Sequence, residues 1–280
     1  MKYANLHLHS VYSDSQLTPY QLVLIGKSLG YRALALTDHW SDGGFDEFSE
    51  SAEAEGIDVI SGVEFDNSDL GTSIHITALD FDRDDPKIRT MIKDQCDART
   101  ECTRKCFERG VSLGFIQGAT WDDVVEFSDE GAWVCIDHVI RALRHKKALD
   151  ACGGSVALRN NVFKGPEIRA FSPKKPSTAE IIKTIRGAGG IATFAHPHRQ
   201  IQYLPALLEL GLNGIEVCHP DLDEESARLA LEAAETYKLY RSGGTDHTGA
   251  MSGCGGAYAI PVYNGATEEE YFTIKERRLG

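Results

Sequence analysis

The stretch Ala4-Asn5-Leu6-His7-Leu8-His9-Ser10 starts the chain as a short apolar strand whose end carries two histidines. In an extended strand alternate side chains share one face, so His7 and His9 point the same way. A shared face is what joint coordination of one metal ion requires. A single His-x-His occurs often by chance, and its weight depends on whether other strands end in the same manner.

Other strand ends carry the same residue types. Continuous apolar runs, typical of buried parallel strands, predict strands at Ala4–His7, Ala33–Thr37, Asp58–Ser61, Ser73–Leu79, Gly190–Ala195, Gly214–Cys218 and Leu239–Ser242. Histidines and acids at or after these runs are Asp38-His39, Glu64, His75, His196 and Asp246-His247. Strand ends converge on one face of a barrel, where active sites lie, so we expect these residues to form one pocket.

Helical patterns separate the strands and predict an α/β fold with a parallel sheet or barrel. Thr18-Pro19 begins one helix, which runs to about Leu29. A capping box from Ser177 to Glu180 begins another, and Ser226–Lys238 is amphipathic. The stretch 86–173 breaks the alternation, with helices expected near Lys87–Arg109, Thr120–Phe127 and Cys135–Ala151, and is interpreted as a helical insertion.

Composition excludes several classes of protein. The 280 residues carry a formal net charge of −13 and are 42% hydrophobic, which fits a globular chain and not a disordered one. The acidity argues against duplex nucleic acid as a partner, because binding could displace few phosphate counterions. No apolar run of about 18 residues suggests a membrane span, and the first residues lack signal-peptide features. Seven scattered cysteines indicate reduced thiols, so we expect a cytoplasmic protein.

Several segments taken together match a known pattern: Asn5-Leu6-His7-Leu8-His9-Ser10, Ser13-Asp14, Ala35-Leu36-Thr37-Asp38-His39, Gly62-Val63-Glu64, His75, Ala195-His196-Pro197 and Gly244-Thr245-Asp246-His247. They resemble the PHP (polymerase and histidinol phosphatase) family of phosphoesterases, relatives of the amidohydrolases. The resemblance implies a distorted (β/α)7 TIM-like barrel formed by residues 1–85 and 174–280, with residues 86–173 as a helical cap. It also implies two or three divalent ions, namely manganese, zinc or iron.

The resemblance assigns ligands to three ions. One would be held by His7, His9, Glu64 and Asp246, and a second by Glu64, which bridges, with His75 and His196. A third would be held by Asp14, His39 and His247. The family usually ends in Asp-x-His, whereas Asp246 and His247 are adjacent in this chain. Three carboxylates give these ligands a formal charge of −3, which three divalent ions would reverse, so a phosphate could bind there.

Candidate substrate contacts lie outside this ligand set. Asp137-His138-Val139-Ile140-Arg141 resembles the His-x-x-Arg segment of the family's phosphatases. Arg141 could bind phosphate through two hydrogen bonds, and His138 could protonate the leaving oxygen. His138, Glu64 and Asp246 are therefore the expected catalytic residues. Further candidates to bind the substrate are Lys164, Arg169, His198 and Arg199.

The predicted function is hydrolysis of a phosphate ester by a metal-bridging hydroxide that attacks phosphorus. The expected substrate is a small metabolite or nucleotide, such as a nucleotide bisphosphate or a cyclic phosphate. Alternatives are a histidinol-phosphate-type phosphatase and an exonuclease on short oligonucleotide ends. A C–N amidohydrolase and a non-catalytic metal-binding module are the alternatives from other classes. The sequence leaves the oligomeric state open.

Overall fold

The computed structural model describes residues 2–128, 132–246 and 264–279. The chain divides into two compact units. The strand-bearing unit comprises Met1–Ile92 and Pro176–Gly280, and the helical unit comprises Lys93–Lys175. Within the described ranges, none of the helices combines the length and apolarity that crossing a membrane requires.

Two sheets form the centre of the strand-bearing unit. The first is parallel throughout and contains β1 (Ala4–Asn5), β2 (Ala33–Ala35) and β3 (Asp58–Ile60). The second has the order β4 (Gly62–Asn67), β5 (Ile74–Leu79), β6 (Ile191–Phe194), β7 (Gly214–Cys218) and β8 (Tyr240–Gly243). The expected α/β architecture is confirmed, and the strands of the described residues form two sheets without closing into one hydrogen-bonded barrel.

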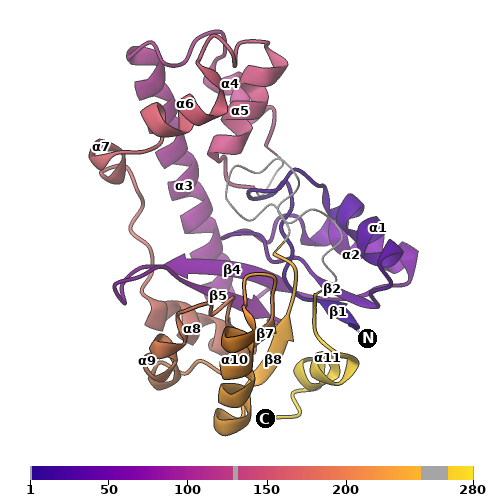
Figure 1. The fold of residues 1–280 in the computed structure, drawn as a ribbon. Helices are drawn as coiled ribbons and strands as arrows, with labels where there is room; N and C mark the ends of the chain where they lie inside the picture. Colours follow the sequence, from indigo (N-terminus) through magenta and orange to yellow (C-terminus); the bar gives the residue numbers. More distant parts are fainter. Residues whose placement is uncertain (1, 129–131, 247–263, 280) are drawn as a thin grey trace. The chain divides into compact units, whose positions relative to one another are not determined.

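The helices of this unit connect and cover the strands (Figure 1). They are α1 (Pro19–Ser28), α2 (Phe45–Glu55), α8 (Thr178–Gly187), a 3-10 turn (Ile201–Tyr203), α9 (Leu204–Glu209), α10 (Glu224–Tyr237) and α11 (Glu268–Lys275). Helix α8 packs on β5 and β6, α10 on β7 and β8, and α11 on β8. The predicted starts of α1 and α8 are confirmed, because Thr18 and Ser177 each form a capping box.

Strand β2 shows why the strands have continuous apolar sequences. Leu34 packs with Leu22 and Phe48 from the neighbouring helices, whereas Ala33 and Ala35 belong to a separate cluster with residues of the second sheet. Both faces of the strand are therefore buried. Burial of a large apolar side chain contributes about 1.5–3 kcal/mol, so such strands favour apolar residues at every position.

The second sheet departs from the expected parallel order. Strand β4 was not predicted, and it pairs antiparallel with β5, which in turn pairs antiparallel with β6. Only a short connection separates β4 from β5, and a parallel pair would need a crossover of about a dozen residues. Glu64 consequently lies inside β4, opposite Thr77, and not after a strand end.

Main-chain hydrogen bonds link the edges of the two sheets. The amides of Leu6 and Asp246 donate to the carbonyls of Gly243 and His7, at 3.0 and 2.9 Å. The amide of Glu64 donates to the carbonyl of Asp38 at 3.2 Å. Residues at the ends of β1 and β2 thereby lie beside residues of β8 and β4.

The helical unit has its own apolar core. It contains most of α3 (Pro86–Ser112), with α4 (Trp121–Val125), α5 (Ile136–His145), α6 (Gly154–Val162) and α7 (Pro166–Arg169). Phe107, Ile116, Val139, Leu143 and Leu158 are among its buried residues. The predicted helical stretches are confirmed, although α5 ends at His145, before the expected Ala151.

The contact of β4 with the segment after β2 leaves no room for a side chain at Gly62. A Cβ there would lie 2.5 Å from the carbonyl oxygen of Leu36. We expect Gly62→Ala to lower the free energy of unfolding by about 1–3 kcal/mol. Gly187→Ala is the matched control, because a Cβ on Gly187 at the end of α8 meets nothing within 4 Å. Urea unfolding of both variants measures this, and equal stabilities would contradict the packing argument.

Candidate metal centre

Four side chains from distant parts of the sequence meet in the strand-bearing unit. His7, His9, Glu64 and Asp246 each place one ligand atom within 4.8 Å of the others. His9 Nε2 lies 2.9 Å from Asp246 Oδ1 and 3.3 Å from Glu64 Oε2. His7 Nε2 lies 3.4 Å from the same Glu64 oxygen. This group is the one that the resemblance assigned to the first ion.

Glu64 is the centre of a larger cluster. Its Oε1 lies 2.9 Å from His75 Nδ1 and 3.1 Å from His196 Nε2. Its Oε2 lies 3.1 Å from His39 Nδ1, in addition to the contacts with His7 and His9. The two oxygens therefore face two different sets of imidazoles, as expected of a carboxylate that bridges two cations.

A third group lies beside the first. Asp14 places one oxygen 3.8 Å from His9 Nδ1 and the other 3.8 Å from His39 Nε2. His247, the remaining ligand expected here, lies outside the described residues. The structure thus brings together eight of the nine predicted ligands: His7, His9, Asp14, His39, Glu64, His75, His196 and Asp246.

The charges of these groups depend on one another. Burial by itself would raise the pKa of Glu64, but His7, His39 and His75 hold that pKa well below its usual range. Burial lowers the pKa of His7, and Glu64, Glu216 and Asp246 outweigh it, so that this pKa is well above its usual value. His7 and the neighbouring carboxylates thus favour each other's charged forms, and a cation that binds His7 must compete with its proton.

The residues present fit divalent cations. Buried polar atoms are normally hydrogen-bonded, yet within the described residues His7 Nε2 and Glu64 Oε2 are buried and form no hydrogen bond. Imidazole nitrogen and carboxylate oxygen are the ligand types that zinc, manganese and iron accept. A cation between these atoms would use their lone pairs and offset the buried negative charge.

The backbone around the ligands is held in unusual conformations. His196 and Asp246 have φ values of 27° and 48°, in the left-handed region that non-glycine residues rarely adopt. Such strain is stored where surrounding contacts enforce it, commonly at functional sites. Asn5 supplies one such contact, because its Oδ1 accepts the amide of Thr245 at 3.1 Å, directly before Asp246.

Asp38 organises the loop that carries Asp14. Its Oδ1 accepts the amide of Ser10 at 2.7 Å, and its Oδ2 accepts the Ser10 hydroxyl at 2.5 Å. The Ser13 hydroxyl also donates to Oδ1, at 2.5 Å. Both oxygens of Asp38 therefore accept hydrogen bonds from the turn between His9 and Asp14.

Two residues of the cluster, Glu216 and His219, were missed from the sequence. Both are buried, and with His7 they place ligand atoms within 4.8 Å of one another. They are three residues apart, and alternation along a regular strand would turn them to opposite faces. A register shift between Glu216 and Cys218 adds one residue and so changes this alternation. The histidine directly after β7 was a visible signal, since other ligands follow strands in the same way.

The predicted substrate contacts are divided between the two units. His198 and Arg199 follow His196 in the strand-bearing unit, where His198 is partly buried and Arg199 is exposed. In the helical unit, His138 is buried and its Nδ1 accepts the amide of Cys135 at 3.0 Å, while Arg141 is partly exposed. Lys164 is exposed and Arg169 ends α7.

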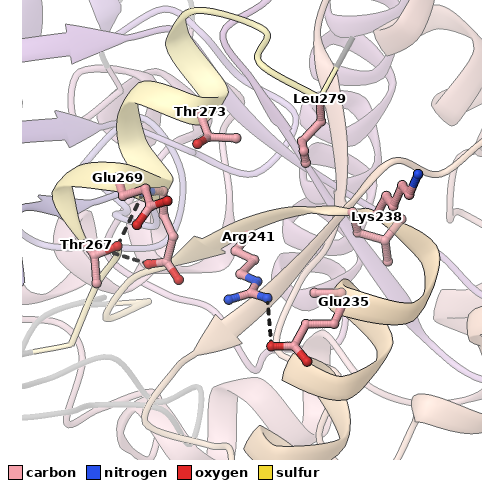
Figure 2. A pocket seen from close by; sticks show the side chains of 10 residues that line it. Glu235, Lys238, Arg241, Thr267, Glu269, Thr273 and Leu279 are labelled. Atoms are coloured by element: carbon pink, nitrogen blue, oxygen red, sulfur yellow. Dashed lines mark hydrogen bonds and ion pairs between the residues drawn. The ribbon is translucent and has the colours of Figure 1, made fainter.

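A separate cavity of about 520 Å³ lies between α10, β8 and α11 (Figure 2). Its lining includes Glu235, Lys238, Arg241 and Thr267, and Arg241 is paired with Glu235 at 3.1 Å. Lys238 caps the end of α10 and Arg241 lies near the start of β8, whereas Asp246 follows the end of that strand. None of the eight described ligands lines this cavity, so it is distinct from the metal centre.

Comparison with known proteins agrees with this geometry. The model of the PHP domain family matches residues 5–155. A 5'-3' exoribonuclease of Haemophilus influenzae is 30% identical over 86% of this chain and 88% of its own length. A 3',5'-nucleoside bisphosphate phosphatase of Chromobacterium violaceum is 29% identical over 86% of each chain. A phosphoribosyl 1,2-cyclic phosphate 1,2-diphosphodiesterase of Eggerthella lenta is 26% identical over 88% of this chain and 94% of its own.

A solved structure extends the similarity to the fold. A protein of Bifidobacterium adolescentis, provisionally described as a metal-dependent phosphoesterase, superposes with a TM-score of 0.79. The match covers 99% of this chain and 96% of the other, at 28% sequence identity. The similarity therefore includes both units.

Divalent cations are expected to stabilise the folded chain, because a ligand that binds only the folded state adds to its stability. At a free Mn²⁺ concentration a hundredfold above its Kd, the gain is about 2.7 kcal/mol. Glu64→Gln should lose most of the bound metal and most of this gain, since it removes the charge that the imidazoles share. Metal analysis and thermal unfolding with and without chelator measure both quantities.

Glu209→Gln is the control, because Glu209 is an exposed glutamate on α9. Its metal content and its stabilisation by Mn²⁺ should equal those of the wild type. A Glu64→Gln protein that retains the wild-type metal content would contradict the assignment of the centre.

Proposed function

The chain belongs to the PHP domain family, and we propose that it is a metal-dependent phosphoesterase that hydrolyses phosphate esters of a small metabolite or nucleotide. The bridging position of Glu64, with imidazoles on both of its oxygens, is the observation that carries this proposal. A shared carboxylate would hold two cations close together, the arrangement that phosphatases use to bind both the attacking and the leaving oxygen.

The described ligands can be divided among three proposed cation sites. His7, His9, Glu64 and Asp246 would hold one divalent ion, and Glu64, His75 and His196 a second. Asp14 and His39, with His247, would hold a third. Ions bound there would acidify a water molecule and neutralise the phosphate, which explains how an acidic protein could bind an anion.

The finer architecture is part of the proposal. The hydrogen bonds between β1 and β8, and between the segments of β2 and β4, support a distorted (β/α)7 barrel. Residues 1–85 and 174–280 would form this barrel, and residues 86–173 would form a cap that selects the substrate. None of the six described cysteines forms a disulfide bond, which supports a cytoplasmic location.

The relatives suggest substrates to examine. Their names specify a nucleoside bisphosphate, a cyclic phosphate and RNA ends, all of which are phosphate esters. We propose a nucleotide with a terminal or cyclic phosphate as the substrate of this chain. An exonuclease that acts on oligonucleotide ends is the second candidate, favoured by the exoribonuclease relative.

A panel of substrates tests the proposal. With Mn²⁺ present, we expect hydrolysis of 3',5'-nucleoside bisphosphates, cyclic phosphates or short oligonucleotides. Phosphate detection measures the phosphate released from a bisphosphate, and chromatography detects the monoester formed from a cyclic phosphate or the nucleotide released from an oligonucleotide. Histidinol phosphate, amides and cyclic ureides serve as comparison substrates. Hydrolysis of amides alone would favour a C–N hydrolase, and no turnover of any substrate with metal bound would favour a non-catalytic module.

Arg199 and Arg141 are proposed to bind phosphate oxygens, with Lys164, Arg169 and His198 as further contacts. We expect Arg199→Ala and Arg141→Ala to reduce kcat/KM about tenfold to a hundredfold, because each loses a charge-assisted hydrogen bond of about 1.5–3 kcal/mol. The matched controls are the exposed Arg186 on α8 and Arg144 on α5. If Arg199→Ala and Arg141→Ala both had the kcat/KM of the wild type, the proposal that these residues bind phosphate would be wrong.

His138 is proposed as the acid that protonates the leaving oxygen. Its Nδ1 accepts an amide proton from Cys135, so Nε2 is the nitrogen that carries a proton in the neutral ring. A substrate with a good leaving group needs little protonation. His138→Asn should therefore slow hydrolysis of alkyl phosphates more than that of nitrophenyl phosphate, and an equal loss on both would indicate a structural role.

A further inference from the structure

Glu216 contacts two of the predicted ligands at once. The carboxylate is buried, with 2% of the residue exposed. Both of its oxygens lie 3.3 Å from His7 Nδ1, and Oε2 also accepts the backbone N–H of His196 at 2.8 Å. One side chain on β7 therefore contacts a ligand that follows β1 and another that follows β6.

The contact with His7 selects which nitrogen can bind a cation. His7 Nε2 faces the centre, at 3.4 Å from Glu64 and 3.7 Å from Asp246. When Nε2 offers its lone pair, Nδ1 carries the proton and donates it to Glu216. A carboxylate on the outer nitrogen of a ligand imidazole fixes its tautomer and orientation.

The contact with His196 restrains a strained backbone. His196 has a φ of 27°, outside the regions that side-chain-bearing residues normally occupy, so its backbone is strained. The hydrogen bond from its amide to Glu216 holds this conformation. In this conformation His196 Nε2 lies 3.1 Å from Glu64 Oε1.

The hydrogen bonds of the neighbouring His219 indicate that Glu216 does not bind an additional cation. His7, Glu216 and His219 lie close enough to hold an ion. However, His219 Nδ1 accepts the amide of Asp221 at 3.0 Å, so its Nε2 carries a proton and has no lone pair to offer. That nitrogen lies 3.5 Å from Asp246 Oδ2, where its proton points to a carboxylate. With His7 Nδ1 also protonated, Glu216 is the single acceptor of the three.

We propose that Glu216 is a positioning residue of the metal centre, which sets the tautomer of His7 and the backbone of His196 without binding a cation. The proposal rests on the metal centre of the proposed function, but not on the identity of the substrate. It makes a distinction that can be measured. Loss of a positioning residue weakens affinity and leaves the number of bound ions unchanged, whereas loss of a ligand lowers that number.

Glu216→Gln is the informative variant, because it keeps the shape and one carbonyl oxygen for His196. Its NH2 group would donate to His7 Nδ1 and so favour the tautomer that carries the proton on Nε2. We expect Mn²⁺ affinity to fall about tenfold to a hundredfold, the effect usual for groups behind metal ligands. At saturating Mn²⁺ the number of bound ions, counted by titration with paramagnetic resonance of free Mn²⁺, should equal that of the wild type.

Glu209→Gln is the control for the loss of one charge and should bind Mn²⁺ as the wild type does. Thermal unfolding of the metal-free variants shows whether Glu216→Gln is folded, and Glu216→Asp, which keeps the charge, should recover part of the affinity. Wild-type affinity in Glu216→Gln, or one fewer ion at saturation, would overturn the proposal. A tenfold weaker affinity in a protein that hydrolyses no phosphate ester would support it and overturn the proposed function instead.

Discussion

The carboxylate of Glu64 is the constraint on which the rest of the centre depends. Five imidazoles, from His7, His9, His39, His75 and His196, lie within 3.4 Å of its two oxygens. An unpaired charge at such depth would cost several kcal/mol, so the carboxylate is stable only while its neighbours are cationic or share a cation with it. The five histidines come from four segments of the strand-bearing unit, since His7 and His9 both follow β1, and each must reach one side chain on β4. The arrangement of the strands can therefore be understood as the way in which the chain satisfies this single buried group.

Much of this centre follows from the sequence, because its signals are local. His7 and His9 share a face by simple alternation, and His39, His196 and Asp246 lie two to four residues after the ends of β2, β6 and β8. Capping residues such as Thr18 and Ser177 likewise define helix starts without reference to the rest of the molecule. Eight of the nine predicted ligands meet in the structure, and seven of them were found from the strand pattern, whereas Asp14 was assigned by the family resemblance alone. The family resemblance added the division of these residues among the ions, which spacing alone does not determine.

What the sequence did not reveal depends on pairing between strands. Strand β4 is hard to recognise because it follows β3 after a single residue, and the reversal at β5 depends on which partner each strand finds. Glu216 was missed because it lies inside a strand whose register shift changes the expected alternation, whereas His219 directly follows β7 and could have been recognised. The distorted (β/α)7 barrel was an expectation from the family resemblance, and the described hydrogen bonds join the strands into two sheets that are linked at their edges. In each case the deciding interaction joins residues that are distant in sequence.

The link between the first and last strands also has a consequence for how the protein is made. The amide of Asp246 bonds to the carbonyl of His7, and Asn5 accepts the amide of Thr245. A ribosome that has released only the first two hundred residues has produced most of the histidines but not the partners that fix His7. The centre therefore belongs to the late, long-range contacts, whose loop-closure entropy slows folding. The group formed by His7, His9, Glu64 and Asp246 can therefore assemble only after β8 and the residues that follow it have been synthesised.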